Sequence, residues 1–346
     1  MSRAACNRGP RVLFLWNVPE RLREYLRRGL VGVDLELDFP EDTSSVELIR
    51  RAPGAAALVG WRPTAELLEA AGELRLFINP GAGVQHLVEL FRDFSLRHPE
   101  HDVTLVNGHG NAGFTAQHTV ALLLALTNRV VPHHNWMVQG RWRTGDAEAA
   151  SLPLKDRRIG LLGYGHVNRR VHRLLVAFGP RFAALRRDWS RAVEPPGHLD
   201  RYTSEELDRF LDWADVLIVC LPQTAATTGL IGAAELDRLG PRSLLVNVGR
   251  GPIIDEEALF TALRTGWLAG AALDVWYDYR PEPDDAGRRR PHRHPFHELN
   301  NVVLSPHRAA SPFDDLGRWD EVICNLTRLV AGRRDFLNII DLERGY

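Results

Sequence analysis

The sequence predicts an α/β protein of two domains, each built on a parallel sheet with helices on its faces. The chain has 346 residues, about twice the length of an ordinary domain. Short apolar runs alternate with amphipathic stretches along most of the chain, which is typical of parallel strands connected by helices. One apolar run ends in a turn that contains Gly163 and Gly165 and leads into a helix, an arrangement that favours phosphate binding.

The composition excludes several classes of protein. Hydrophobic residues make up 45% of the chain and charged residues 25%, unlike disordered, collagen-like or disulfide-stabilised chains. The formal net charge is −1, so we expect neither nucleic acid nor a membrane as a partner. The cysteines, Cys6, Cys220 and Cys324, are too few and too far apart for a disulfide framework. No apolar signal segment begins the chain, and we therefore expect a cytoplasmic location.

Five strands are expected in the first part of the chain. These apolar runs lie at residues 11–16, 33–39, 56–60, 74–78 and 103–107. The amphipathic stretches at 20–28 and 64–72 have the spacing of helices that cover such a sheet.

A second alternating block begins near Phe114 with a long apolar helix, expected over residues 114–131. About six strands follow, and together with the helices between them they give a doubly wound pattern. These strands are expected at residues 158–163, 181–185, 216–222, 243–249, 270–276 and 301–307. Residues 277–297 are rich in Pro, Asp and Arg, and a loop of that length is usually functional or mobile.

The turn after residues 158–163 predicts a dinucleotide site. Gly163 permits a tight turn, and Gly165 lets the backbone approach a pyrophosphate. The helix that begins at His166 and Val167 would present its N–H groups and positive dipole end to the phosphates. Asn168 stands where the pattern GxGxxG has its third glycine, so we expect the helix to be displaced from the strand.

Arg186 and Arg187 end the next predicted strand, where the dinucleotide pattern expects an acid for the ribose 2′-hydroxyl. An arginine fork can instead bind a 2′-phosphate. The sequence therefore favours NADP over NAD. In the alternative interpretation, Asp188 is the acid contact and the two arginines are solvated surface.

Two residues at predicted strand ends could carry chemistry on a small anion. Arg250 follows the strand 243–249 and could bind a carboxylate or polarise a carbonyl. His307 follows the strand 301–304 and could exchange a proton with an alcohol near neutral pH. Each alone is more simply a structural residue, but open α/β sheets bind ligands at this edge.

The order of several motifs resembles the D-isomer-specific 2-hydroxyacid dehydrogenase family. They are NPGAGVQHL, NGHGNAGFTAQHTVALLLAL, GLLGYGHVN, ADVLIVCLPQTAATTGLI, LLVNVGRGPIIDEEAL, AGAALDVW and NVVLSPH, between Leu74 and Ala310. The resemblance implies a flavodoxin-like substrate domain formed by residues 1–112 and 307–346. A Rossmann-type NAD(P)-binding domain, residues 113–306, would be inserted into it. It also implies a homodimer, with the helix after Phe114 across its axis.

The resemblance assigns roles to individual residues. Arg250 would bind a 2-oxo acid, and His307 would be the acid/base in hydride transfer with NAD(P). The N–H groups of Ala82, Gly83 and Val84 would hold the substrate carboxylate. The residues along the cofactor would be Gly163, Gly165, His166, Val167, Arg186, Arg187, Cys220, Leu221, Pro222, Thr227, Val248, Gly249, Asp274 and His307.

One position departs from the family. Tyr279 stands where the family usually has the glutamate that orients the histidine. Glu282 would reach His307 if the loop bulges, and Asp278 is a neighbouring candidate. A related branch of the family that has DVWY at this place resembles this chain.

Three alternatives remain open from the sequence. His292, His294 and His297 invite a metal site, but no nearby cysteine or carboxylate completes it, and we expect no metal. Within the enzymes, a phosphite- or formate-type dehydrogenase would share the same Arg–His pair. An NAD(P)-sensing protein without turnover would share the fold alone.

Overall fold

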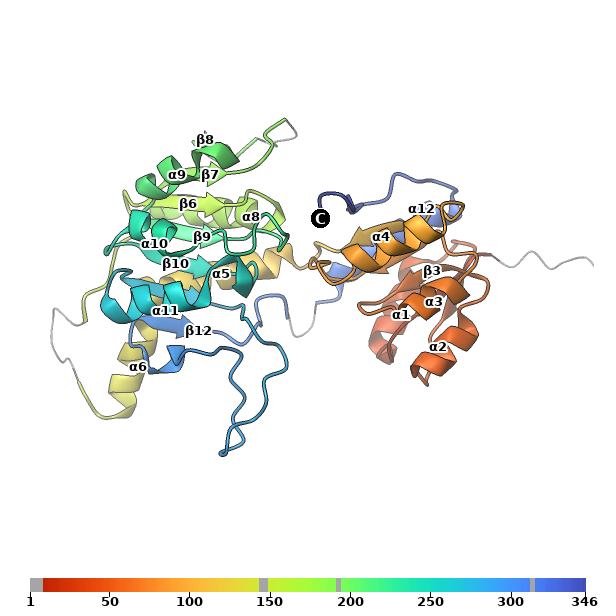
Figure 1. Cartoon of the computed structure of the whole chain (residues 1–346), viewed down its shortest axis with the longest axis horizontal. Coiled ribbons are helices and arrows are strands. Elements are labelled where there is room, and N and C mark those ends of the chain that lie inside the picture. Colours follow the sequence, from red (N-terminus) through yellow and green to blue (C-terminus); the bar gives the residue numbers. More distant parts are fainter. Residues whose placement is uncertain (1–8, 143–148, 191–193, 312–314) are drawn as a thin grey trace, which may run out of the picture. The chain divides into compact units, whose positions relative to one another are not determined.

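The computed structural model describes residues 9–142, 149–190, 194–311 and 315–346 (Figure 1). The chain divides into two compact units. The terminal unit comprises residues 1–111 and 312–346, and the central unit comprises residues 112–311. Cys6 and the first residues of the chain, on which the expected absence of a signal segment depends, lie outside the described residues.

The terminal unit contains a five-stranded parallel sheet in the order β2-β1-β3-β4-β5. This is the strand order of flavodoxin, and every pairing is parallel. The strands are β1 (Arg11–Phe14), β2 (Glu36–Asp38), β3 (Ala55–Val59), β4 (Leu76–Asn79) and β5 (Thr104–Asn107).

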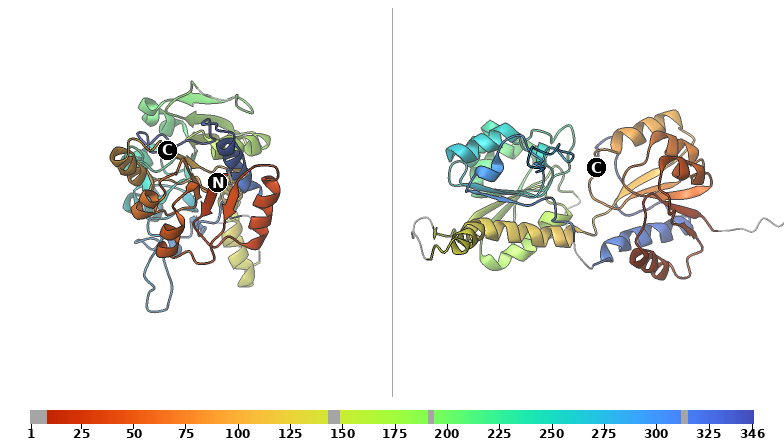
Figure 2. Two further views of the ribbon diagram at one scale, coloured as in Figure 1. Left: turned by 90° about the vertical axis from the view of Figure 1, so that its right-hand side faces the viewer. Right: turned by 90° about the horizontal axis from the view of Figure 1, so that it is seen from below.

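Helices cover both faces of this sheet. Leucines of α1 and α12 belong to one buried cluster, whereas the apolar residues of α2, α3 and α4 belong to the other. Figure 2 shows α12, from the end of the chain, beside α1. The helices are α1 (Glu20–Gly29), α2 (Ser45–Arg51), α3 (Ala65–Ala70), α4 (Val88–Arg97) and α12 (Asp320–Val330), which follows the short 3₁₀ turn η5 (Gly317–Trp319).

The central unit contains a seven-stranded parallel sheet in the order β12-β11-β10-β9-β6-β7-β8. Counted within the unit, this is the Rossmann order with one further strand at an edge. The strands are β6 (Arg158–Leu162), β7 (Arg181–Leu185), β8 (Asp200–Tyr202), β9 (Val216–Val219), β10 (Leu244–Asn247), β11 (Gly270–Leu273) and β12 (Val302–Leu304). The predicted α/β class with a Rossmann-type sheet is thereby confirmed, although β8 was not predicted.

Two sets of helices enclose the central sheet. Apolar side chains of α5 and α8 pack on one face, and those of α9, α10 and α11 pack on the other. The helices are α5 (Ala112–Thr127), α6 (Val130–Val138), α8 (His166–Leu175), α9 (Leu207–Trp213), α10 (Ala233–Leu239) and α11 (Glu256–Thr265). Short 3₁₀ turns are η1 (Val176–Phe178), η2 (Ser204–Glu206), η3 (Gly251–Ile253) and η4 (Phe296–Glu298).

The helix expected over residues 114–131 is confirmed as far as Thr127, where α5 ends, but it does not continue to residue 131 as one helix. Arg129 has a φ of 52°, so the backbone turns left-handed there and separates α5 from α6. A left-handed residue stops the helical hydrogen-bond ladder. The residue that breaks the helix is neither glycine nor proline, so the sequence pattern does not predict the break.

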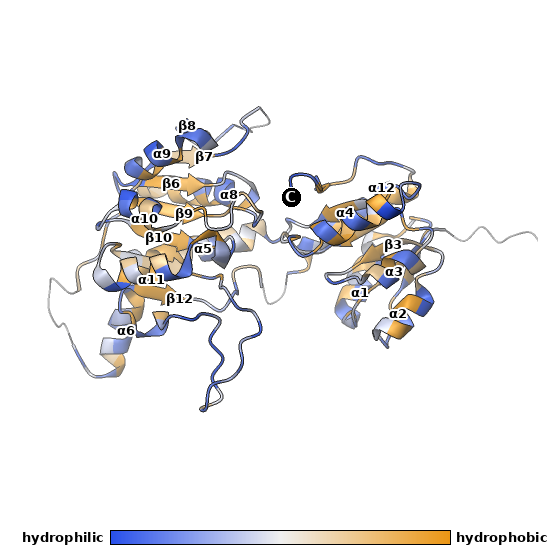
Figure 3. Ribbon diagram, in the orientation of Figure 1, coloured by the Kyte–Doolittle hydropathy of each residue, from blue (hydrophilic) through white to orange (hydrophobic). Residues whose placement is uncertain are grey.

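Residues 277–297 form a long excursion between β11 and η4. A bridge between Pro283 and Arg289 makes a hairpin in it, and Asp284 accepts hydrogen bonds from the backbone of Ala286 and Arg288. Figure 3 shows this segment as hydrophilic, whereas the strands of both sheets are hydrophobic. The residues from Glu282 to Arg289 are exposed.

Candidate active site

The turn between β6 and α8 has the local geometry of a phosphate-binding loop. Gly163 has a φ of 87°, and a Cβ there would lie 2.6 Å from the carbonyl oxygen of Cys220. Gly165 begins α8 without a side-chain cap, and nothing lies within 4 Å of the position its Cβ would take. Open space at an uncapped helix start fits a phosphate group.

Asn168 replaces the third glycine of the pattern and ties α8 to the sheet. The residue is fully buried, and its Nδ2 donates to the carbonyl oxygens of Gly163 at 2.7 Å and Ile218 at 3.3 Å. An amide therefore bridges the ends of β6 and β9, where a glycine would only permit close packing.

A buried imidazole supports the same turn. His172 is fully buried, and its Nδ1 lies 2.8 Å from the hydroxyl of Tyr164, the middle residue of the turn. Its ring packs on Phe182 with a centroid separation of 4.1 Å. Burial lowers the pKa of His172 to about 4, so this imidazole is neutral at pH 7.

Arg186 and Arg187 follow β7 at its carboxyl end, as predicted from the sequence. Arg186 is partly buried and Arg187 is exposed. Asp188 is exposed, and its Oδ1 accepts from the backbone N–H of Ser190 at 2.8 Å. One carboxylate oxygen is thus engaged in shaping the loop, while the side chain of Arg186 forms no ion pair with a described carboxylate.

The loop after β9 is braced internally. The hydroxyl of Thr227 donates to the carbonyl oxygen of Pro222 at 2.7 Å and accepts from the N–H of Thr224 at 2.8 Å. Burial raises the pKa of Cys220 to about 12, which leaves a neutral thiol. The loop presents fixed backbone rather than a reactive sulfur.

The loop after β10 positions Arg250. Asn247, the last residue of β10, is buried; its side chain accepts from the N–H of Gly249 and donates to the carbonyl oxygen of Arg250. A Cβ on Gly251 would lie 2.3 Å from the carbonyl oxygen of Trp276, so the loops after β10 and β11 are in direct contact. Arg250 is partly buried and forms no ion pair with a described carboxylate.

Asp274 holds the loop that carries His307. The carboxylate is buried and accepts from the N–H groups of Arg308 at 2.8 Å and Ala309 at 3.1 Å. It also accepts from the hydroxyl of Ser305. His307 has a φ of 55°, a conformation that costs energy for a residue other than glycine and persists only where its surroundings impose it. Asp274 was predicted to contact the cofactor; in the structure it holds the residues on both sides of His307.

His307, Arg250 and Tyr279 lie together. The rings of Tyr279 and His307 meet edge to face with a centroid separation of 5.2 Å. Although His307 has an exposed surface, the protein around its ring removes water and lowers its pKa, and the charge of Arg250 lowers the pKa further. The carboxylate of Asp274 acts in the opposite direction.

Glu282 does not lie beside His307. It belongs to the exposed hairpin, and no hydrogen bond or ion pair joins it to His307 among the described residues. Asp278 is also exposed, and its Oδ1 accepts from the N–H of Arg280. The described neighbour of the imidazole is Tyr279 itself.

The turn after β4 in the terminal unit has its carbonyl groups tied back. Asn79 donates to the carbonyl oxygens of Gly81 and Gly83, and Asn107 donates to that of Ala82 at 2.8 Å. No described residue accepts a hydrogen bond from the N–H groups of Ala82, Gly83 or Val84. Unpaired N–H groups in a turn favour an anion.

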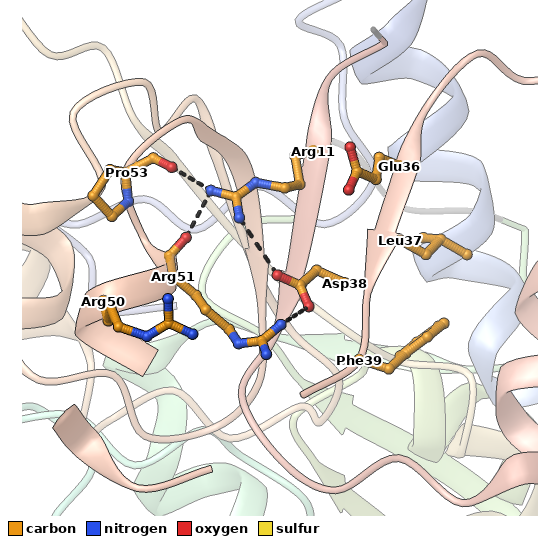
Figure 4. Close-up of a pocket in the computed structure, with 8 residues that line it drawn as sticks. All are labelled: Arg11, Glu36, Leu37, Asp38, Phe39, Arg50, Arg51 and Pro53. Carbon is orange, nitrogen blue, oxygen red and sulfur yellow. Dashed lines mark hydrogen bonds and ion pairs between the residues drawn. The ribbon is translucent and has the colours of Figure 1, made fainter. Parts of the chain in front are cut away.

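The pocket shown in Figure 4 is not the predicted site. Its volume is about 400 Å³, and it lies between β1, β2 and α2. Arg11 and Arg51 both pair with Asp38, at 3.4 Å and 2.8 Å. None of the predicted site residues lines it.

The described residues contain neither a candidate metal cluster nor a candidate membrane-spanning helix. No group of three or more His, Cys, Asp or Glu side chains among them could hold a metal ion. His292 and His297 stack on each other, with centroids 5.7 Å apart. No helix in the described ranges is both long and apolar enough to cross a membrane.

The sequence of the central unit matches a known family. The model described as "D-isomer specific 2-hydroxyacid dehydrogenase, NAD binding domain" covers residues 120–309, which is more than half of the chain. The chain belongs to the D-isomer specific 2-hydroxyacid dehydrogenase family. The predicted family is thereby confirmed.

Individual relatives agree with this assignment. A D-3-phosphoglycerate dehydrogenase of Archaeoglobus fulgidus is 29% identical over 87% of this chain and 53% of its own, so the chain spans about half of that relative. A glyoxylate reductase of Korarchaeum cryptofilum is 29% identical over 96% of both chains. A D-isomer specific 2-hydroxyacid dehydrogenase of Xanthobacter autotrophicus, solved with NADPH and MES, aligns with a TM-score of 0.77 and 25% identity over 98% of this chain and all of its own.

Sequence reasoning missed the residues that support the site. Asn79, Asn107 and Asn247 each end a buried strand. Asn79 and Asn247 fix the loops that follow them, whereas Asn107 holds the turn after β4. A polar residue at the end of an otherwise apolar run was the available signal. His118 was also missed: its Nε2 lies 2.9 Å from the hydroxyl of Ser305. Nothing in the spacing of residues 118 and 305 indicates that contact.

Proposed function

We propose that this protein interconverts a small 2-oxo acid and the corresponding D-2-hydroxy acid with NAD(P) as the hydride carrier. The observation that carries the proposal is the pairing of Arg250 with His307. An arginine without a carboxylate partner lies beside an imidazole whose backbone is held in a left-handed conformation. Both follow strands of one parallel sheet, at the edge where such sheets bind ligands.

In the proposed reduction, His307 donates a proton to the carbonyl oxygen, and in the oxidation it accepts the proton of the hydroxyl. A bound nicotinamide supplies or accepts the hydride at the adjacent carbon. Arg250 binds the carboxylate and polarises the carbonyl. Because the substrate's negative charge offsets that of Arg250, substrate binding raises the pKa of His307 and favours the protonated form that reduction needs.

We assign the carboxylate of the same substrate to the turn Ala82–Val84. Its N–H groups have no described acceptor, and Asn79 and Asn107 hold the carbonyl groups of the turn away. A preformed set of donors binds an anion without having to reorganise. In this proposal the terminal unit is the substrate domain and the central unit is the cofactor domain.

For the cofactor, we propose the turn of Gly163 and Gly165 and the start of α8 as the pyrophosphate site. The loops of Cys220–Thr227 and of Val248 and Gly249 would lie along the rest of the dinucleotide. Arg186 and Arg187 would bind a 2′-phosphate, which favours NADP. The relative from Xanthobacter autotrophicus, solved with NADPH, supports this choice.

The assembly we propose is a homodimer in the cytoplasm. α6 has no buried residue, and Val130, Met137 and Val138 are 53%, 54% and 74% exposed. An apolar helix that lies on the surface of a monomer is typical of an interface. Light scattering after gel filtration measures the mass directly, and a mass of 38.9 kDa would contradict this part.

The deciding experiment is turnover with a panel of donors and acceptors. Purified protein should oxidise NADPH with glyoxylate or hydroxypyruvate. Reduction of NAD(P) by phosphite or formate, without activity on 2-oxo acids, would favour the phosphite- or formate-type alternative. Binding of NADPH with no turnover of any of these would favour the non-catalytic sensor.

A further inference from the structure

A second arginine lies at the edge of the other sheet without a carboxylate partner. Arg318, in the 3₁₀ turn before α12, is partly buried, and burial lowers the pKa of its guanidinium. Its Nη2 donates to the carbonyl oxygen of Pro80 at 3.3 Å. Its Nε is buried and has no hydrogen-bond partner among the described residues. A buried cation with a single neutral acceptor is costly.

The described acids near Arg318 in sequence each have another partner. Asp320 accepts from the hydroxyl of Tyr25, and this bond raises the pKa of Tyr25 to about 12. Glu321 accepts from the N–H groups of His109 and Gly110. The fold thus keeps the nearby carboxylates away from Arg318.

Asp315 completes this set, because its Oδ1 accepts from the N–H of Gly317 at 2.6 Å. No described carboxylate lies within ion-pair distance of Arg318. The described residues therefore leave this charge available to water or to a ligand.

Tryptophan rings hold the guanidinium in place. Its Cζ lies 5.1 Å from the ring centroid of Trp319, and Trp319 stacks on Trp16 with centroids 5.5 Å apart. Trp61 meets Trp16 at 4.8 Å. A guanidinium on an aromatic face keeps its edge available for a bidentate anion.

This cluster adjoins the proposed carboxylate turn. Pro80, the acceptor for Arg318, immediately precedes that turn, and the indole nitrogen of Trp61 lies 3.4 Å from where a Cβ of Gly81 would be. Trp16 and Trp61 follow β1 and β3, so the rings and the turn share the carboxyl edge of one sheet. Apolar walls next to the carboxylate position suit a short carbon chain.

We propose that Arg318 binds a second anionic group of the substrate, so that the preferred substrate is a 2-oxo acid with a distal carboxylate or phosphate. This inference rests on the proposed function. It follows from charge balance: the reacting carboxylate already has the turn and Arg250, and Arg318 is one positive charge more than a monoanion needs. The tryptophan rings contact the carbon chain between the two acidic groups.

The test compares substrates that differ only at the distal end. Wild-type kcat/KM with NADPH is measured for glyoxylate, 2-oxobutyrate, oxaloacetate and 3-phosphohydroxypyruvate, and oxaloacetate and phosphohydroxypyruvate distinguish carboxylate from phosphate. One of these two should exceed 2-oxobutyrate. Arg318→Met should lower its kcat/KM by about 30-fold more than that of 2-oxobutyrate. Arg318→Lys should restore part of the preference.

The substrate ratio is independent of the fraction of protein that folds. Arg333→Met is the matched control, because Arg333 is an exposed arginine of the same unit that pairs with Asp335; it should leave the ratio at the wild-type value. An equal loss for all substrates, glyoxylate included, would overturn the proposal and assign Arg318 to the reacting carboxylate or to the fold. An unchanged ratio would overturn it as well.

A binding measurement separates this inference from the proposed reaction. D-malate and D-2-hydroxybutyrate are titrated by calorimetry into the protein saturated with NADP. Wild type should bind D-malate more tightly, and Arg318→Met should remove the difference. Equal affinities in wild type would contradict the second anion site whether or not the protein turns over glyoxylate, whose turnover alone tests the proposed function.

Discussion

Each unit has an arginine without a carboxylate partner at the carboxyl edge of its sheet, and the two differ in what surrounds them. Arg250 lies among groups that exchange protons: its charge influences the pKa of His307, Tyr279 and Cys220. Arg318 lies against Trp319. An arginine among titratable groups can alter proton transfer, whereas an arginine among rings can only select what binds. Under the proposed function, we call the edge with Arg250 the chemical edge and the edge with Arg318 the recognition edge.

The largest effect should come from the chemical edge. His307→Asn removes the proposed acid/base and should lower kcat for glyoxylate by about 10²- to 10⁴-fold, with little change in NADPH affinity. His198→Asn is the control, since His198 is an exposed histidine of the same unit. A kcat within threefold of wild type would remove His307 from the chemistry and with it the contrast between the two edges.

Arg250→Gln should produce the next largest effect. The loss of a charge-assisted contact predicts a fall of about 100-fold in kcat/KM for every 2-oxo acid, whatever its distal group. Steady-state kinetics on the substrate panel measure this. Arg209→Gln, which alters an exposed pair with Glu206, serves as control. If Arg250→Gln instead changed only the preference among substrates, Arg250 and Arg318 would have the same role.

A third prediction concerns His172, the buried imidazole of the central unit. The folded-state pKa of His172 is about 4, below the usual 6.5, so the unfolded state binds the proton more readily between these values. Stability should therefore be complete above pH 6.5 and fall as the pH decreases towards 4, by about 2–3 kcal/mol. Urea unfolding across this range measures the loss.

The matched variants for this prediction are His172→Gln and His198→Gln. The first should remove most of the pH dependence, because glutamine does not titrate. The second alters an exposed side chain and should retain it. Identical pH curves for wild type and His172→Gln would show that another group is responsible.

Cofactor choice should change by a smaller factor. Arg186→Gln should raise KM for NADPH by about tenfold and leave KM for NADH nearly unchanged, since only NADPH has a 2′-phosphate. Initial rates with both cofactors give the ratio. If Asp188→Asn weakens the binding of NADH more than Arg186→Gln weakens the binding of NADPH, the ribose is recognised by the acid and not by the arginine.

The smallest expected effect is the uptake of a fraction of a proton when an anion binds. Because Arg250 holds the pKa of His307 down, an anion that neutralises Arg250 should cause uptake of a fraction of a proton near pH 6.5. Calorimetric titration of oxamate in two buffers of different ionisation enthalpy measures the uptake. His307→Asn should abolish it, and uptake that persists in that variant would point to another group.

Much of the fold follows from sequence pattern, because burial on both faces makes parallel strands continuous apolar runs. β3 and β9 are fully buried, and both were predicted. β8 reads Asp-Arg-Tyr and is largely exposed, so it has no apolar run to reveal it. The helix break at Arg129 could not be predicted either, because arginine has no preference for the left-handed backbone that it adopts there.

Site residues could be predicted from the sequence where a single motif contains both the residue and the strand that precedes it. Gly163, Arg250 and His307 each follow a predicted strand, so their positions at the sheet edge follow from chain order. The cluster of Trp16, Trp61 and Trp319 draws on distant segments, and no local spacing connects them. Glu282 was expected near His307 by analogy, but it is exposed beside the bridge of Pro283 and Arg289, and no described contact joins it to His307.

Gly251 has a consequence for engineering. Its backbone lies so close to Trp276 that no side chain fits between them, so the segments that bear Arg250 and Tyr279 are in direct backbone contact. Grafting either segment alone from a relative would create a steric conflict. Transplants that change specificity should exchange both together, as a single cassette.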